Sequence, residues 1–258
     1  MRLLKFSFAS AVLLVSFNAL SDDCAILDAN RIEWDDAYAS SIWQTCMEDR
    51  YHPIAQFNIG WMYEHGRGVR RNSAEAAKWF RASAVQGFAP AQNSLGVRYA
   101  EGDGVGQDFY EAAKWFRSAA LQGHDEAQRN LGTLYLGGQG VTQSYSEAAK
   151  WLRMSAEQGN AAAENNLGLL YMGGQGVRKD GSEAAKWFRK AAEQGVTQSQ
   201  FNLGLMYWKG IGVNQDKSEA AKWLGKAAAR GDRDAKRALD SMNRDKGGIK
   251  GWFESLWN

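Results

Sequence analysis

The sequence repeats itself every 36 residues, and this feature limits the fold more than any other. Tryptophan recurs at this spacing without an insertion or deletion, at Trp79, Trp115, Trp151, Trp187 and Trp223. The motif Gly-x-Gly-Val recurs at the same spacing, starting at Gly66, Gly102, Gly138, Gly174 and Gly210. Five units therefore follow one another, at 53–88, 89–124, 125–160, 161–196 and 197–232. Self-similarity with a fixed period of this length predicts a solenoid in which each unit packs on the next.

Each unit is predicted to form two α-helices. Between 161 and 172, Leu167, Leu170 and Tyr171 recur at helical spacing, and a glycine pair follows at the expected helix end. We expect Ser182 to cap the second helix and Gly195 to end it. The apolar stripe of this second helix is predicted to contain Ala184, Trp187, Phe188 and Ala191. Only 2 prolines occur among 258 residues, as expected where helices fill the chain, and the predicted fold class is all-α.

Four patterns follow one another in each unit with few changes: Leu-Gly-x-x-Tyr (Ile-Gly in the first unit), Gly-x-Gly-Val, Glu-Ala-Ala-Lys-Trp-Phe (Trp-Leu in the third and fifth units) and Gln-Gly (Arg-Gly in the last unit). This order, at a period of 36 residues, resembles the Sel-1-like repeat family over roughly residues 52–246. The family is related to tetratricopeptide repeats, so the resemblance implies a right-handed α/α superhelical solenoid of helix-turn-helix repeats. It also implies binding and scaffolding of other proteins, frequently by exported or envelope proteins. It points to no single partner.

The two ends of the chain depart from the repeat. Residues 22–52 keep Trp43 in register with the repeat tryptophan, so we expect a degenerate N-terminal capping repeat there. Residues 233–246 match the first helix of a further unit and are predicted to form a partial repeat. Residues 247–258 are an amphipathic tail, predicted either to fold back on the last repeat as a cap helix or to touch a partner or membrane. Its apolar side chains share one helical face: Ile249, Trp252, Phe253, Leu256 and Trp257.

Residues 1–21 have the organisation of a secretory signal peptide. Arg2 and Lys5 precede a largely apolar stretch, which ends in small residues before Asp22. The apolar stretch of about 15 residues is shorter than the roughly 20 that a membrane-spanning helix needs. The acidic residues before Cys24 do not fit the small-residue motif of a lipid-anchored protein. We therefore expect an exported protein with no stable membrane span after cleavage, located in the periplasm or, alternatively, secreted.

Removing the signal peptide changes the charge balance. The whole chain has 31 Lys+Arg and 29 Asp+Glu, and loss of Arg2 and Lys5 leaves 29 against 29. A formally neutral chain gives no electrostatic support for nucleic acid binding, so no nucleic acid partner is expected.

The two cysteines, Cys24 and Cys46, are expected to form a disulfide because the chain is predicted to be exported. A pair of buried free thiols is the alternative. We expect no metal site, since His52, His65 and His124 are scattered and lack the spacing of metal ligands.

The sequence contains no catalytic motif, and we expect neither enzymatic activity nor a cofactor. The Gly-x-Gly-Val motif lacks the Lys-Ser/Thr of a phosphate-binding loop and occurs once per repeat, which is typical of a turn. No Gly-x-Ser-x-Gly nucleophile motif is present. Cysteine-rich relatives in the resembling family have been linked to β-lactam binding. This chain lacks their cysteine pair in every repeat, so a β-lactam-binding enzyme is the less favoured reading.

The resemblance implies that the first helices of the repeats line a concave groove. Counting from the glycine of the Leu-Gly pattern in each repeat selects the positions expected on this face. The candidate partner-binding residues are Phe57, Trp61, Asn93, Val97, Arg129, Leu136, Asn165, Leu169, Met172, Phe201, Leu205 and Trp208. The same register adds Ile54, Glu64, His65, Thr133, Gln198 and Lys209. Large apolar residues such as Trp61, Phe201 and Trp208 suggest anchors for a protein partner, although they could instead pack between neighbouring repeats.

A polar set also recurs along this face, at Asn58, Ser94, Asn130, Asn166 and Asn202. Each asparagine amide both donates and accepts hydrogen bonds, so the four asparagines are a possible ladder for the backbone of an extended peptide. They could equally bond the adjacent repeat.

These features predict a non-catalytic, exported protein-protein interaction module that binds a protein or peptide in its concave groove. The first hypothesis is a periplasmic adaptor or scaffold. The alternative is a periplasmic immunity protein, an inhibitor that binds and neutralises a secreted toxin enzyme, because relatives of the resembling family include such proteins.

Overall fold

The computed structural model describes residues 46–47 and 50–244. The predicted signal peptide at 1–21, most of the predicted N-terminal cap and the tail at 247–258 lie outside these residues. The described part contains eleven helices and no strand, which confirms the all-α prediction. None of these helices is long and apolar enough to cross a membrane.

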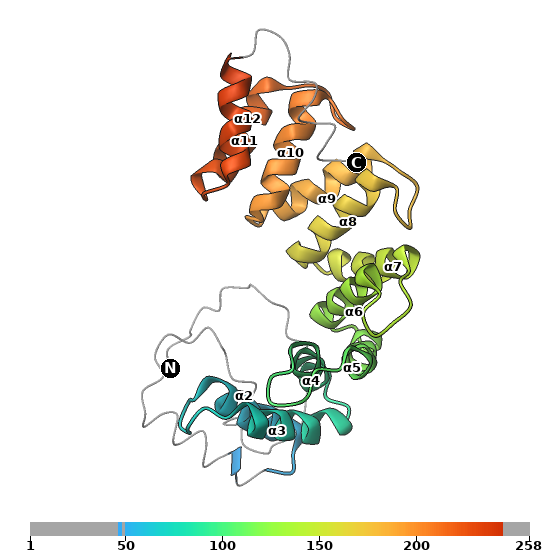
Figure 1. Cartoon of the computed structure of the whole chain (residues 1–258), viewed down its shortest axis with the longest axis vertical. Helices are drawn as coiled ribbons and strands as arrows, with labels where there is room; N and C mark the ends of the chain where they lie inside the picture. The colour runs from blue at the N-terminus through green and yellow to red at the C-terminus, as the bar shows by residue number, and fades with distance from the viewer. Residues whose placement is uncertain (1–45, 48–49, 245–258) are drawn as a thin grey trace, which may run out of the picture.

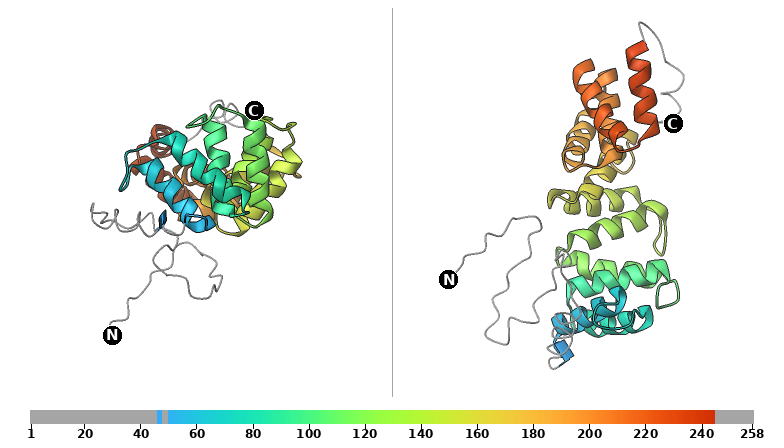
Figure 2. Two further views of the ribbon diagram at one scale, coloured as in Figure 1. Left: turned by 90° about the horizontal axis from the view of Figure 1, so that it is seen from below. Right: turned by 90° about the vertical axis from the view of Figure 1, so that its left-hand side faces the viewer.

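Each repeat contributes two helices of equal length. The first helices are α2 (Pro53–His65), α4 (Ala89–Glu101), α6 (Asp125–Gly137), α8 (Ala161–Gly173) and α10 (Thr197–Lys209). The second helices are α3 (Ser73–Val85), α5 (Phe109–Leu121), α7 (Tyr145–Glu157), α9 (Gly181–Glu193) and α11 (Lys217–Ala229). The last described helix, α12 (Arg233–Arg244), packs on α11. Contacts run from each helix to its neighbours in sequence, so the pairs stack into a curved solenoid (Figures 1 and 2).

Local sequence decides where the helices begin and end. The side chain of Asp180 caps α9, because its Oδ1 accepts hydrogen bonds from the backbone N–H groups of Ser182 and Glu183 at 2.9 and 3.1 Å. The prediction of Ser182 as this cap is therefore wrong by two residues, since α9 already begins at Gly181. At the end of α8, Gly174 adopts a left-handed conformation with φ of 70° and donates to the carbonyl of Leu170.

A glycine in each first helix allows the two helices of a repeat to approach closely. A Cβ atom at these positions would lie 2.6 to 2.8 Å from a side chain of the second helix, closer than such atoms pack. The pairs are Gly60 with Phe80, Gly96 with Phe116, Gly132 with Leu152, Gly168 with Phe188, and Gly204 with Leu224. In α9 the predicted stripe of Ala184, Trp187, Phe188 and Ala191 is buried, which confirms it as the packing face.

The Gly-x-Gly-Val loop joins one repeat to the preceding one. The second glycine of the motif has positive φ, for example 67° at Gly176. A Cβ atom there would collide with the backbone of Tyr145, at the start of α7 in the preceding repeat. Gly104, Gly140 and Gly212 make the same approach to the preceding second helix. The motif therefore serves packing between repeats, because only glycine fits both the conformation and the space.

Arginine and tyrosine side chains also link successive repeats. An arginine in each of α3, α5, α7 and α9 donates to the hydroxyl of a tyrosine in the next first helix: Arg81 to Tyr99, Arg117 to Tyr135, Arg153 to Tyr171 and Arg189 to Tyr207. The guanidinium carbon lies 5.5 to 5.9 Å from the tyrosine ring centroid. After the fifth repeat both partners change together, because Gly225 and Asn243 occupy the equivalent positions.

Candidate functional site: the inner face of the solenoid

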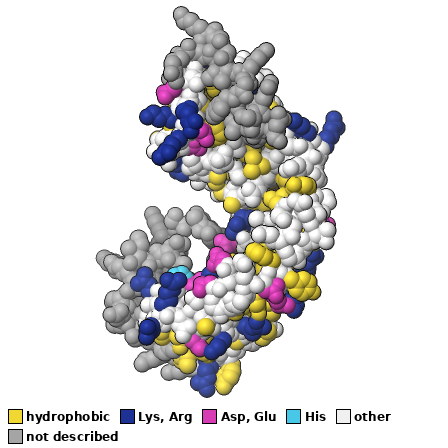
Figure 3. Space-filling model, in the orientation of Figure 1, with side chains coloured by type: hydrophobic (Ala, Val, Ile, Leu, Met, Phe, Trp, Pro, Cys, Tyr) yellow, Lys and Arg dark blue, Asp and Glu magenta, His cyan; other side chains and the backbone are white. Residues whose placement is uncertain are grey.

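The curved stack leaves a hollow on one side of the molecule. In the middle of the solenoid, α4 and α6 lie toward this hollow, while α5 and α7 lie on the outer side (Figure 1). Acidic side chains gather on the lower part of the inner wall, in the half of the solenoid that holds the first repeats (Figure 3).

The predicted groove residues of the first four repeats mostly remain accessible. Leu169 is 38% exposed. Six others are half-buried: Phe57, Trp61, Val97, Arg129, Leu136 and Asn165. Phe57 also has a packing role, since its ring lies 5.7 Å from that of Phe80 and 5.5 Å from that of Phe88. These residues could therefore contact a partner, and their binding role stays a prediction.

At the other end of the solenoid the predicted apolar groove residues are buried. Phe201, Leu205 and Trp208 are only 4%, 1% and 5% exposed, so they do not line an open groove. Met172 and Asn93 are buried as well. Large apolar side chains are stabilised by removal from water, and here packing has buried residues that the register alone placed on a surface.

The four asparagines of the possible ladder all have side-chain partners within the chain. Asn130 Nδ2 donates to Asn93 Oδ1 of the preceding repeat at 2.9 Å. Asn202 Oδ1 accepts from Gln198 at 3.2 Å, and Asn166 Oδ1 accepts from Asn165 at 3.4 Å. Asn58 Nδ2 lies 3.9 Å from the sulfur of buried Cys46. The Asn130–Asn93 bond is of the kind expected if the ladder joins repeats, and a role in peptide binding stays a prediction.

The described residues include only one of the two cysteines of the predicted disulfide. Cys46 is fully buried, and Cys24 lies outside the described residues. The pairing of these two cysteines therefore stays a prediction.

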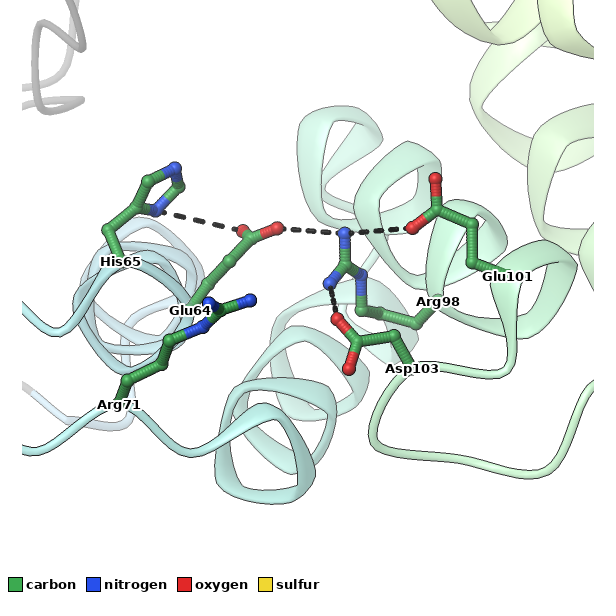
Figure 4. Close-up of a pocket in the computed structure, with 6 residues that line it drawn as sticks. All are labelled: Glu64, His65, Arg71, Arg98, Glu101 and Asp103. Carbon is green, nitrogen blue, oxygen red and sulfur yellow. Dashed lines mark hydrogen bonds and ion pairs between the residues drawn. The ribbon is translucent and has the colours of Figure 1, made fainter.

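A cavity of about 410 Å³ opens between the first two repeats. Six side chains line it, and together we call them the Arg98 cluster: Glu64, His65, Arg71, Arg98, Glu101 and Asp103. The last residues of α2 and α4 and the two loops that follow these helices supply them (Figure 4).

Arg98 is the centre of this cluster. Its Nη2 lies 2.8 Å from Glu64 Oε1, across the boundary between the two repeats, and 3.5 Å from Glu101 Oε2. Its Nη1 pairs with Asp103 Oδ2. Arg98 is 9% exposed, and its Nε atom is buried without a hydrogen-bond partner. The guanidinium therefore holds three carboxylates in place around the cavity (Figure 4).

Two residues of the cluster interrupt the packing pattern of the repeat. The position of Arg98 is occupied by buried apolar residues in the other repeats, Met62, Leu134, Leu170 and Met206. The position of Glu64 is occupied by Ala100, Leu136, Met172 and Trp208. Sequence register placed Glu64 and His65 on the inner face but missed Arg98. Comparison of the repeats could have found it, because a single arginine stands where the other four residues are apolar.

His65 connects the cluster to an aromatic side chain. The imidazole stacks on the ring of Trp61, with centroids 4.1 Å apart. Its Nδ1 lies 2.9 Å from the carbonyl oxygen of Trp61, so Nδ1 carries the proton in this contact. The side chain of His65 is 44% exposed, so the imidazole is accessible to a partner.

All six side chains that line the cavity are polar: three carboxylates, two guanidinium groups and one imidazole. Among the described residues, no group of His, Cys, Asp and Glu is arranged to hold a metal ion. What the cavity offers is fixed charge beside an aromatic ring, which suits a polar side chain or backbone of a partner.

A family model described as the Sel1 repeat matches the chain at 53–88, 89–124, 125–160, 161–196 and 197–232. The chain belongs to the Sel1 repeat family. Proteins of this family are generally protein-interaction modules. The matched segments coincide with the five units that the 36-residue period defines.

Two solved Sel1 repeat structures resemble this one closely. One is c5321 of uropathogenic Escherichia coli, described as a protective antigen with an SLR fold, at 36% identity and a TM-score of 0.77. The match covers 86% of this chain and 48% of c5321, so the chain spans about half of that protein's length. The other is a Sel1 repeat protein of Oxalobacter formigenes, at 33% identity, a TM-score of 0.74 and coverage of 86% and 90%. No sequence among curated proteins matches the chain.

Proposed function

We propose that this chain is an exported, non-catalytic scaffold that binds a protein or peptide on its inner face, with the Arg98 cluster as the recognition point. The proposal includes export by residues 1–21 and a periplasmic location, with secretion as the alternative. It is supported by the family, whose members are generally protein-interaction modules, and by the accessible inner face of the first repeats.

The observation that carries the proposal is the buried charge of Arg98. Taking a guanidinium and its carboxylates out of water costs free energy, and well-packed apolar residues of similar volume are often as stable or more stable. Four repeats of this chain show that an apolar residue fits the position of Arg98. Packing therefore does not require the arginine, and a use in holding Glu64, Glu101 and Asp103 toward the cavity accounts for it.

The charges of the cluster define the partner's chemistry. Three carboxylates face two guanidinium groups, and Arg98 is engaged with the carboxylates around it. The side chains of Glu101 and Asp103 are 58% and 37% exposed, so their oxygens can still accept hydrogen bonds. A partner segment with a basic or hydrogen-bond-donating side chain, followed by an apolar side chain near Trp61, fits this arrangement.

The test is cross-linking of the tagged mature chain, Asp22–Asn258, in the periplasm of its own host, followed by mass spectrometry of the captured proteins. The decisive variant is Glu64→Ala/Arg98→Met, which places residues of the other repeats at both positions. We expect recovery of the dominant partner to fall at least tenfold with this variant. Unchanged recovery of the same partner would exclude the Arg98 cluster as the recognition point.

A matched control separates loss of binding from loss of folding. Glu164→Gln also introduces the residue of the other repeats, but in α8, away from the Arg98 cluster. It should leave partner recovery unchanged. Both variants must retain the helical circular dichroism of the wild-type protein and unfold with a free energy within about 1.5 kcal/mol of the wild-type value.

The identity of the captured partner also separates the two roles that the sequence leaves open. An envelope protein, together with an envelope defect when the gene is deleted, would favour the scaffold. A secreted toxic enzyme, together with a growth defect only when that enzyme is present, would favour the immunity protein. The mass of the periplasmic form tests export, because cleavage after Ser21 predicts a chain that begins at Asp22.

A further inference from the structure

The inner face of α10 is buried where the same face of other repeats is open. Leu205 is 1% exposed, whereas Leu169 at the equivalent position of α8 is 38% exposed and Thr133 of α6 is exposed. Phe201 and Trp208, one turn to either side of Leu205, are 4% and 5% exposed. These three side chains form one apolar patch, which we call the α10 patch.

The stacking of the described helices is similar at these two positions. α12 follows α11 as α10 follows α9, and it packs mainly on α11 with only slight contact to α10. The contact between α8 and α10 is weaker still, and Leu169 is open to solvent. A further contact beyond the repeat geometry would account for the greater burial of Leu205.

The chain itself supplies a segment of matching chemistry next to this patch. The sequence continues from Arg244 through residues 245–258, and α12 ends beside the last repeat. This segment carries Ile249, Trp252, Phe253, Leu256 and Trp257 at i, i+3, i+4, i+7 and i+8. As a helix it would place all five on one face, and residues 249–257 would span about 14 Å, enough to cover a patch two helical turns long.

We propose that residues 245–258 dock on the α10 patch, with Trp252, Phe253 and Trp257 against Phe201, Leu205 and Trp208. The C-terminal end of the inner face is then occupied by the chain itself, and the first repeats, with the Arg98 cluster, are left for a partner. This docking is intramolecular and needs no partner, so its failure would not contradict the proposed function, nor would failure of the proposed function contradict the docking.

The test measures the accessibility of position 205 in the full-length chain. A Leu205→Cys variant is labelled with a thiol reagent under native conditions, and the rate is read on the peptide that contains position 205 by mass spectrometry. Peptide-level readout keeps Cys24 and Cys46 from interfering. The matched control is Leu169→Cys, at the equivalent and open position of α8.

Labelling is compared with and without Trp252→Ala/Phe253→Ala/Trp257→Ala in the same full-length chain. We expect labelling at position 205 to accelerate at least tenfold with the triple substitution, while labelling at position 169 stays the same. Trp252→Phe/Trp257→Phe should keep the protection, since it retains aromatic side chains. Phe201→Cys serves as a second probe where Leu205→Cys lowers the melting temperature.

Two outcomes would overturn the proposal. Protection at position 205 that persists in the triple variant would mean that the described helices bury the patch by themselves. Protection that disappears on dilution of the unsubstituted tail would mean that a second copy of the chain covers the patch, and a dilution series from micromolar to nanomolar protein measures this directly.

Discussion

Arg98 of α4 forms an ion pair with Glu64 of α2, with 2.8 Å between Nη2 and Oε1, across the boundary of the first two repeats. In every other repeat the position of Arg98 is a buried methionine or leucine. The pair thus replaces an apolar contact between repeats with a charged one. Because it lies at the cavity where Glu101 and Asp103 also meet, this substitution within the repeat pattern places fixed charge on the inner face.

Placing the residues of the other repeats at positions 64 and 98 should show how much the Arg98–Glu64 pair contributes to stability, apart from any role in binding. Arg98→Met alone leaves Glu64 and Asp103 without their partner and should lower the free energy of unfolding by about 1–3 kcal/mol. Glu64→Ala/Arg98→Met should return to within about 1 kcal/mol of the wild-type protein, since apolar replacements of ion pairs are often neutral. Urea denaturation followed by circular dichroism measures both. A double variant as unstable as the single one would show that packing does require the charges.

Close approach of the two helices of a repeat should make Gly168 intolerant of a side chain. A Cβ atom there would lie 2.7 Å from Phe188, so Gly168→Ala should destabilise the protein by about 1–3 kcal/mol. Gly225→Ala in α11 is the matched control, because a Cβ atom at Gly225 meets nothing within 4 Å. That change should be neutral or stabilise by up to about 1 kcal/mol, as alanine is the better helix former. Thermal denaturation of both variants tests the difference.

Glu164 should make stability depend on pH at a position where the other repeats carry glutamine. Burial raises the pKa of Glu164 above its ordinary value of 4.5, although Gln194 donates a hydrogen bond to it at 2.9 Å. The folded protein therefore binds this proton more tightly than the unfolded chain, and the associated stability is lost as the pH rises above 4.5.

Glu164→Gln should therefore raise the free energy of unfolding by about 0.5–1.5 kcal/mol at pH 7. The gain should shrink toward pH 4, where Glu164 becomes protonated in both states. The Gln158–Gln128 hydrogen bond at 2.8 Å in the preceding repeat shows that the neutral pair fits. Melting curves between pH 4 and 7 measure the difference, and a gain that is independent of pH would contradict the account.

His124 should make stability depend on pH in the direction opposite to Glu164. Burial lowers the pKa of His124 below its ordinary value of 6.5, despite the nearby Glu126 and Asp125, and its Nδ1 accepts a hydrogen bond from the backbone of Ala127 at the start of α6. The folded state disfavours the protonated imidazole, so stability present above pH 6.5 is lost as the pH falls through the lowered pKa. His124→Asn should retain the cap, as Asn160 does for α8, and should remove this part of the pH dependence.

The sequence by itself determined the repeat, its period and its two helices. Trp187, Phe188 and the surrounding alanines predict the packing face of α9 because contacts within a repeat involve residues close in sequence, which helical spacing places on one face. Glycine positions such as Gly168 and Gly174 could be found in the same way, since the repeat shows which of them never vary within the chain.

Only the tertiary structure decided which side chains of neighbouring repeats meet and which inner positions remain open. The Arg98–Glu64 pair and the Asn130–Asn93 bond depend on the rotation between successive repeats, and the 36-residue period does not specify that angle. Leu169 and Leu205 occupy the same position in the repeat, yet one is 38% exposed and the other 1%. Exposure is set by everything that covers a residue in space, so identical positions in a repeat acquire different surroundings at the middle and at the end of a solenoid.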